Sequence, residues 1–204
     1  MMIRLLSISI FLMSSIANAQ TAKQQLQVFS KNLQTAQTSF QQLVSGPNGE
    51  KVQSAQGTLK LKTPNQFRWQ YTSPTSQLVV ADGSKIWIYE ADLQQVTVKT
   101  QDSLNQDNPL SALLNPQMMD KFYSTSELAK KQGVNWLQLI PKNKENSPFE
   151  KALLGFTNNV LVSMQLFDSL GQVSTFTFGA WKNNKKLDPK LFQFVVPKGV
   201  DVVE

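Results

Sequence analysis

Histidine and cysteine, the side chains on which most acid–base, nucleophilic and zinc-dependent enzymes rely, are both absent from this chain of 204 residues. The sequence therefore cannot build a histidine-based triad, a thiol nucleophile or a zinc site of the usual ligand types. It also lacks the glycine-rich G-x-x-x-x-G-K and G-x-G-x-x-G loops and the G-x-S-x-G nucleophile motif. These absences exclude most hydrolase mechanisms and leave no predicted cofactor or metal site.

Paired carboxylates are the remaining way to build an acid–base catalyst, and Glu90 with Asp92 in "YEAD" is the densest pair. The two residues end a predicted strand, where acidic side chains more often form a solvated hairpin rim. We therefore predict that the protein is not an enzyme.

Apolar strands are the more informative feature. In "NQFRWQY" the side chains of Phe67, Trp69 and Tyr71 alternate with Arg68 and Gln70, so the three rings share one face of a strand. The next apolar strand, "KIWIY", places Ile86 and Ile88 on one face and Trp87 and Tyr89 on the other, which predicts a strand covered on both sides. Two interpretations stay open for these residues: ordinary core, or the wall of a site for an apolar ligand.

The spacing of apolar residues predicts one helix followed by a long series of strands. Near the start, helical spacing relates Leu26, Phe29, Leu33 and Ala36. Alternating residues then predict consecutive strands up to residue 100, with Asp82-Gly83 as a hairpin turn. Strands resume at residue 135, and a helical turn at Asp188-Pro189 precedes a last strand.

The stretch from residue 102 to 133 interrupts the strands. Pro109, Pro116 and Gly133 divide it into short predicted helices, the first capped by Asp107 or Asn108. Its apolar residues are Leu110, Leu113, Leu114, Met118, Met119, Phe122 and Tyr123. About ten or eleven strands with these helices predict a strongly curved antiparallel sheet, whose covered inner face is either filled with side chains or left as a ligand cavity.

The first 19 residues indicate export. Arg4, an apolar run from Leu5 to Ile16 and a small-x-small sequence ending at Ala19 are typical of a cleaved signal peptide. The alternative, a membrane anchor, would need a run of about 20 apolar residues. We expect residues 1–19 to be a signal peptide and residues 20–204 to form a single domain, soluble outside the cytoplasm and without a cysteine to carry a lipid anchor.

The formal net charge of +6, or +5 without Arg4, comes almost entirely from lysines, which are densest at Lys182, Lys185, Lys186 and Lys190. A nucleic-acid-binding protein would more often show arginines interleaved with aromatic residues, so we predict no nucleic-acid partner. A solvated lysine surface is the simpler interpretation; attraction to an anionic membrane surface or an acidic partner is the alternative.

Several stretches together resemble one protein family. "LKTPNQFRWQYTSPTSQLVVADGSKIWIYEADLQQVTV", "LLGFTNNVLVSMQLFDSLGQVSTFTF" and "LDPKLFQFVVPKGVDVV" are similar to the periplasmic outer-membrane lipoprotein carrier protein family, LolA. This resemblance implies an unclosed β-barrel with helices forming a lid over a hydrophobic cavity. It further implies a periplasmic monomer that accepts triacylated lipoproteins from an inner-membrane ABC transporter of the LolCDE type and delivers them to the outer-membrane acceptor LolB. A protein of the same fold that binds another amphiphile, such as a glycolipid, or that senses lipoproteins, is the alternative.

The resemblance also assigns expected roles. The cavity and rim candidates are Phe67, Trp69, Tyr71, Leu59, Leu61, Ile86 and Ile88, and the lid candidates are Leu110, Leu113, Leu114 and Met118. In much of the family a basic residue before the proline of the loop that precedes the "F-x-W" strand holds the lid shut. Thr63, followed by Pro64, occupies this latch position here. A neutral hydrogen bond is about half as strong as a charge-assisted one, which predicts a more loosely held lid.

Overall fold

A computed structural model describes residues 20–101, 109–145 and 147–203 of the chain. Over these residues the protein forms one sheet of 13 strands. The strands are β1 (Thr35–Ser45), β2 (Lys51–Lys62), β3 (Gln66–Ser73), β4 (Gln77–Ala81), β5 (Lys85–Glu90), β6 (Gln95–Thr100), β7 (Tyr123–Lys131), β8 (Val134–Pro141), β9 (Lys151–Thr157), β10 (Val160–Phe167), β11 (Val173–Phe178), β12 (Lys182–Asn183) and β13 (Asp201–Val203). The helices are α1 (Ala22–Ser30), α2 (Ser111–Leu114) and α3 (Pro116–Phe122), with 3-10 turns η1 (Ala91–Leu93) and η3 (Pro189–Phe192).

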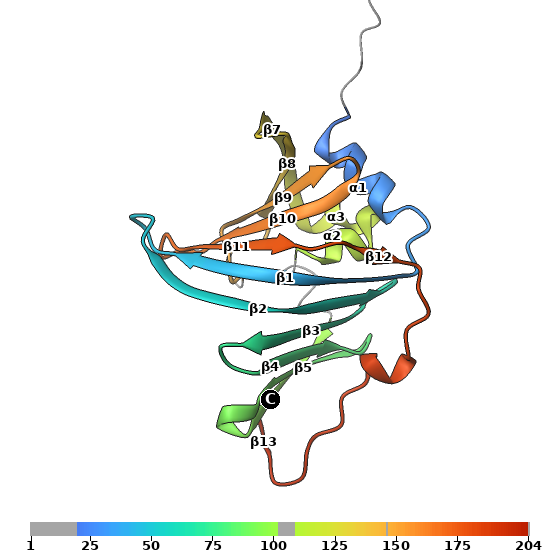
Figure 1. Ribbon diagram of the computed structural model, residues 1–204, viewed down its shortest axis with the longest axis vertical. Helices are drawn as coiled ribbons and strands as arrows, with labels where there is room; N and C mark the ends of the chain where they lie inside the picture. Colours follow the sequence, from blue (N-terminus) through green and yellow to red (C-terminus); the bar gives the residue numbers. More distant parts are fainter. Residues whose placement is uncertain (1–19, 102–108, 146, 204) are drawn as a thin grey trace, which may run out of the picture.

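The sheet is strongly curved and does not close (Figure 1). Its strand order is β13-β6-β5-β4-β3-β2-β1-β11-β10-β9-β8-β7, with β12 paired to β1 beside this path. Neighbouring strands run antiparallel except β13, which pairs parallel to β6. Strands β7 and β13 are therefore the two edges, and the predicted curved antiparallel sheet is confirmed.

Alternation along the strands separates the two faces of the sheet as predicted. In β2, Leu59 and Leu61 are fully buried, whereas Lys60 and Lys62 point to the other face and are half-buried. In β5, Ile86 is buried on the inner face, and on the outer face the ring of Trp87 stacks on Phe194 with centroids 5.6 Å apart. The prediction that "KIWIY" is covered on both faces is confirmed.

The first helix is shorter than predicted. Thr21 and Gln24 form a capping box at its start, and the helix ends at Ser30. Asn32 then takes a positive φ of 58°, and β1 begins at Thr35. Leu33 and Ala36 are buried, as the apolar spacing indicated, but Ala36 lies in a strand whose ladder bonds to β2 and β12 replace helical ones. The predicted helical continuation to Ala36 is wrong.

The middle segment contains both short helices and a strand. Helices α2 and α3 are confirmed, with Pro116 in the first turn of α3. Pro109 lies in a turn before α2, and the predicted caps Asp107 and Asn108 lie outside the described residues. From Tyr123 onward the prediction of helix is wrong, because this stretch pairs with β8 as strand β7. Strands β7 and β12 account for the difference between 13 strands and the predicted ten or eleven.

The three α-helices lie on the inner side of the sheet (Figure 1). Helix α1 buries Leu26 and Phe29 against β8, β9 and β10, and it also contacts α2 and α3. On the outer side, the chain after β12 crosses β1 to β3 and reaches η3, where the Asp188 side chain accepts a hydrogen bond from the Lys190 N–H. This confirms the predicted helical turn. Among the described residues, no helix is long and apolar enough to cross a bilayer.

The Asp82-Gly83 turn joins β4 and β5, as predicted, with Gly83 at a φ of 107°. Burial would raise the pKa of the Asp82 carboxyl, but hydrogen bonds from the Lys85 N–H, the Trp87 indole, and the Ser84 N–H and hydroxyl outweigh this effect and lower the pKa to about 2. Because the folded-state pKa lies below the unfolded value, this carboxylate stabilises the fold above pH ~4, and the contribution is lost as the pH falls through about 2.

We therefore expect Asp82→Asn to lower the free energy of unfolding at neutral pH by about 1 kcal/mol, a value reduced for solvent exposure. The difference from the unmodified protein should shrink as the pH falls from ~4 towards 2, which thermal unfolding at several pH values would measure. Asp92→Asn, at an exposed position in the next turn, is the matched control. An Asp82→Asn difference that did not depend on pH would contradict the assignment.

Candidate functional site

A cavity of about 250 Å³ lies between the inner face of the sheet and the short helices. Its sheet side is formed by Pro64, Asn65, Phe67, Ile86 and Gln101, and its helix side by Ser111, Leu114, Asn115, Met118 and Phe122. Four residues predicted from the sequence, Phe67 and Ile86 of the rim and Leu114 and Met118 of the lid, thus line the same cavity. The structure brings these two groups together from positions far apart in the chain.

Strand register explains how the sheet side of the cavity is built. Phe67 lies directly opposite Leu61 on one side and Ala81 on the other, and Ala81 lies opposite Ile86. Directly opposite residues point to the same face, so these four side chains form one apolar row across β2 to β5. Phe67 and Ile86 are the members of the row that reach the cavity.

The other predicted residues lie deeper in the protein. Leu59, Leu61, Leu110 and Leu113 are almost completely buried in the core. Ile88 and Tyr71 are partly buried and pack against the same cluster. None of these residues lines the cavity, so the interpretation of these positions as ordinary core stays open beside the role implied by the resemblance.

An aromatic cluster surrounds Trp69. Its ring centroid lies 4.7 Å from that of Phe40 and 5.1 Å from that of Phe176, and Tyr71 packs edge-on against Phe40 at 5.2 Å. Burial raises the pKa of the Tyr71 hydroxyl to about 12, although the neighbouring Trp69 side chain partly opposes this shift. The Trp69 indole nitrogen is itself buried and has no partner with full hydrogen-bond geometry. The interior behind the cavity is therefore densely packed with aromatic rings and largely apolar.

Gln101 is a rim residue that the sequence reasoning missed. Its side chain is only 7% exposed and joins two turns: the Gly83 N–H donates to its Oε1 at 2.9 Å, and its Nε2 donates to the Asn65 carbonyl. The Asn65 side chain also donates to the Gly83 carbonyl at 3.2 Å. These bonds brace the rim beside Phe67 and Ile86. A glutamine at the end of an alternating strand has no distinctive sequence signal.

Thr63 and Arg68 occupy separate places. The Thr63 hydroxyl donates to the Leu33 carbonyl at 2.9 Å, in the connection between α1 and β1. Arg68 lies on the outer face, where its guanidinium donates to the Leu191 carbonyl at 3.5 Å. The sequence expectation that Arg68 lies opposite the face of Phe67 and Trp69 is therefore confirmed.

Helix α3 is tied to the rest of the protein by charged side chains. The Lys23 ammonium of α1 lies 3.0 Å from both carboxylate oxygens of Asp120 in α3, and this is the single salt bridge found over the described ranges. Lys142 donates to the Asp120 carbonyl at 2.6 Å. In addition, Glu127 of β7 accepts from the Ala22 and Lys23 N–H groups at the start of α1, each at 2.9 Å.

The carboxylate pair considered for catalysis lies away from this cavity. Glu90 accepts a hydrogen bond from the Gln77 amide at 3.3 Å, and Asp92 is exposed in η1. No cluster of three or more potential metal ligands was found in the part of the chain that the structure describes.

Known proteins resemble this chain over most of its length. Residues 31–195 match the family model "Outer membrane lipoprotein carrier protein LolA". An outer-membrane lipoprotein carrier protein of Xanthomonas oryzae pv. oryzae is 42% identical over 183 residues, covering 89% of this chain and 88% of the relative. One from Nitrosospira multiformis is 37% identical over 194 residues, covering 95% and 93%.

Solved structures are similar in fold. A LolA superfamily protein from Nitrosomonas europaea has a TM-score of 0.50 at 13% identity, covering 86% of this chain and 99% of its own. An uncharacterised conserved protein from Thermus thermophilus has a TM-score of 0.52 at 13% identity, covering 88% and 94%.

The Lys23–Asp120 pair leads to a prediction about the mobility of the helices. Its side chains are 37% and 64% exposed, so the pair contributes about 0.2–1 kcal/mol. We expect Lys23→Gln or Asp120→Asn to speed amide hydrogen exchange in α3 about one and a half- to fivefold, as measured by mass spectrometry. High salt should have a similar effect on the unmodified protein. Lys31→Gln, at the other end of α1, should leave α3 unchanged, and equal effects of Lys31→Gln and Lys23→Gln would refute the role of the pair.

Proposed function

The chain belongs to the LolA family of outer membrane lipoprotein carrier proteins, and from this premise we propose that it carries triacylated lipoproteins across the periplasm. It would accept them from an inner-membrane ABC transporter of the LolCDE type and deliver them to the outer-membrane acceptor LolB. The acyl chains would lie between the sheet and helices α2 and α3. The observation that carries this proposal is the convergence of Phe67, Ile86, Leu114 and Met118 on one cavity between sheet and helices.

The energetics of the cargo require an enclosed apolar site. Each methylene group transferred from water to an apolar environment contributes about 0.8 kcal/mol, so the acyl chains of one lipoprotein amount to tens of kcal/mol. A lipoprotein would not cross an aqueous compartment unassisted. A carrier that lowers this cost must nevertheless release the chains to the next site, which requires a cover that can open.

The cavity is too small for this cargo in the conformation described. Its 250 Å³ lies below the roughly 300–1,000 Å³ that encloses a drug-sized ligand. Acyl chains can therefore enter only if the helices move away from the sheet. This makes α2 and α3 the expected moving parts.

The helices are suited to such a movement. Helix α2 has four residues and α3 has seven, and neither has a side-chain cap at its start. Helices of this length are not stable alone in water, so packing against the sheet holds them in place. Acyl chains that replace this packing would offset the cost of moving the helices.

Photo-crosslinking tests where the acyl chains bind. A photoreactive phenylalanine analogue in place of Met118 should crosslink to a triacylated lipoprotein when the purified proteins are mixed, because this side chain lines the cavity. The same analogue in place of Val52, which is 57% exposed on β2, is the control. Equal crosslinking at the two positions would contradict the proposed site.

Depletion of the protein in its native host tests the proposed task itself. Lipoproteins destined for the outer membrane should accumulate in the inner membrane, as fractionation would show. Normal sorting, together with a glycolipid co-purifying with the periplasmic protein, would favour the alternative of a carrier for another amphiphile.

The latch position gives a further prediction. We propose that Thr63, whose neutral hydrogen bond reaches the α1–β1 connection and not α2 or α3, holds the cover more weakly than a basic residue would. Thr63→Arg should therefore slow release of a bound lipoprotein about two- to tenfold, corresponding to the gain from a charge-assisted bond. Release to an acceptor can be followed over time, with Thr75→Arg at an exposed position as the control. Identical release by the two variants would reject the latch role.

A further inference from the structure

Basic side chains are concentrated on the outer face of the sheet, opposite the cavity. Lys182, Gln37, Lys60 and Arg68 lie directly opposite one another on the adjacent strands β12, β1, β2 and β3. Because directly opposite residues share a face, these four side chains form a row across the sheet. Three of the four are cationic, and the row contains no acidic residue.

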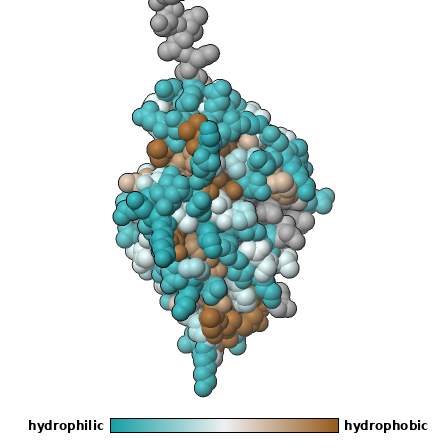
Figure 2. All heavy atoms as spheres, turned by 90° about the vertical axis from the view of Figure 1, so that its right-hand side faces the viewer, coloured by the Kyte–Doolittle hydropathy of each residue, from teal (hydrophilic) through white to brown (hydrophobic). Residues whose placement is uncertain are grey.

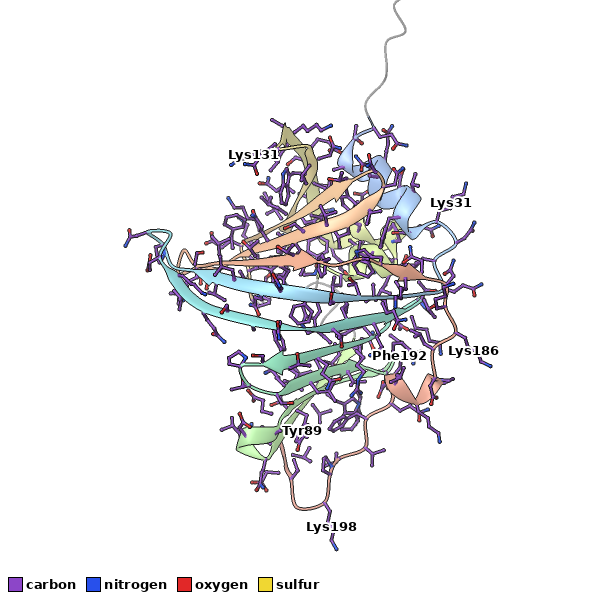
Figure 3. The ribbon with its side chains drawn as sticks, viewed as in Figure 1. Lys31, Tyr89, Lys131, Lys186, Phe192 and Lys198 are labelled. Atoms are coloured by element: carbon purple, nitrogen blue, oxygen red, sulfur yellow. The ribbon has the colours of Figure 1, made fainter. Side chains whose placement is uncertain are left out.

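The chain that follows β12 adds further cations beside this row. The Lys185 carbonyl accepts a hydrogen bond from the Thr35 hydroxyl, and Thr35 lies opposite Lys62. Farther along, Lys190 precedes Leu191, whose carbonyl accepts from Arg68. We define the basic face as Lys60, Lys62, Arg68, Lys182, Lys185, Lys186 and Lys190. Figure 3 shows Lys186 pointing away from the sheet.

This face accounts for the net charge of the protein. From residue 20 onward the sequence has 19 basic and 14 acidic residues. The basic face contains seven of the basic residues, and the only acidic residue in its segment 182–190 is Asp188. The face therefore carries a formal +6, whereas all other residues from position 20 onward sum to −1. None of the seven basic residues forms a salt bridge with an acid in the described parts of the chain.

The arrangement is electrostatically unfavourable in isolation. Burial lowers the pKa of Lys60, and the charge of Arg68 directly opposite lowers it further. Like charges in this position destabilise a strand pair. An anionic surface placed against the face would relieve this repulsion.

Exposed valines lie on the same side. The ring of Phe194 packs inward against Trp87 and Tyr89, so the next side chain of this extended segment, Val195, points outward and is 85% exposed. Val202 of the edge strand β13 is also exposed, and it lies opposite Val96, which lies opposite Tyr89 on this outer face. Figure 2 views the molecule from the side along which the chain after β12 runs. In this view, apolar side chains gather in the lower part of the molecule.

We propose that the basic face and Val195 dock the protein on the surface of an anionic phospholipid bilayer. Lysines spread over a broad sheet face suit the extended negative potential of a bilayer, and an exposed aliphatic side chain suits its interface. A protein that binds an acidic polypeptide segment would more often present a groove for that segment. The basic residues here instead come from several strands and from the segment that crosses them. Because Phe67 and Ile86 lie on the opposite face, docking leaves the cavity free.

Vesicle flotation tests this proposal with the protein lacking residues 1–19. Vesicles of equal parts phosphatidylglycerol and phosphatidylcholine should bind it at low salt, whereas vesicles of phosphatidylcholine alone should not. High salt should abolish binding. The variant Lys185→Gln/Lys186→Gln/Lys190→Gln should bind the anionic vesicles at least about 30-fold more weakly, because each lysine near such a surface contributes severalfold.

Matched variants distinguish the face from net charge. Lys130→Gln/Lys131→Gln/Lys144→Gln removes three exposed lysines elsewhere and should retain most of the binding. Val195→Ser should weaken binding severalfold, whereas Leu170→Ser, at a residue that is 73% exposed, should not. The proposal is overturned by an absence of binding to anionic vesicles, by equal losses in the two triple variants, or by polyglutamate binding more tightly than the vesicles at equal charge concentration.

Discussion

The apolar inner face of the curved sheet is the constraint on which the rest of the structure depends. A face that includes Leu59, Leu61 and Phe67 must be shielded from water, and the sheet does not close on itself, so the helices must supply the shield. Burial of a leucine such as Leu110 or Leu113 contributes about 1.5–3 kcal/mol. The exposed Lys23–Asp120 pair contributes at most about 1 kcal/mol. Apolar contact therefore contributes most of the free energy that holds the helices in place, and the polar bonds contribute less.

Strand alternation gives this sheet two separate surfaces with different properties. On β2 and β3, Leu61 and Phe67 face the helices, whereas Lys60 and Arg68 face outward. A shift of one residue in register would exchange the two sets, placing cations in the interior. The same hydrophobic requirement that forms the inner face thus also holds the basic residues in a row on the outer face. The C-terminal segment reinforces the outer face by covering its apolar part, where Phe194 meets Trp87 and Tyr89.

Features governed by local sequence could be predicted, and those governed by distant pairing could not. The Asp82-Gly83 hairpin, the alternation in "KIWIY" and the helical turn after Asp188 depend on neighbouring residues and are confirmed. The spacing of Ala36 matches a helix, but partners on β2 and β12 draw this residue into a strand. Residues 123–131 likewise lack a strong pattern and become a strand through pairing with β8. At the site, Phe67, Ile86, Leu114 and Met118 could be chosen for apolar character, whereas Gln101 acts through two turns that only the fold brings together.

The small cavity and the short helices together determine how the proposed handover could be driven. A ligand shifts a conformational equilibrium only by the difference between its affinities for the two states. In the proposed function, acyl chains exceed the cavity of the conformation described, so their whole interaction with the inner face favours a conformation in which the helices have moved away. The opposing cost is the packing that α2 and α3 lose, which consists of the same kind of apolar contact. Leu114 and Met118 can replace this lost contact by packing against the acyl chains. The net free energy of loading the empty protein is therefore small compared with the total free energy gained by burying the acyl chains. A second apolar site of similar depth could then receive the cargo without an energy source on the carrier.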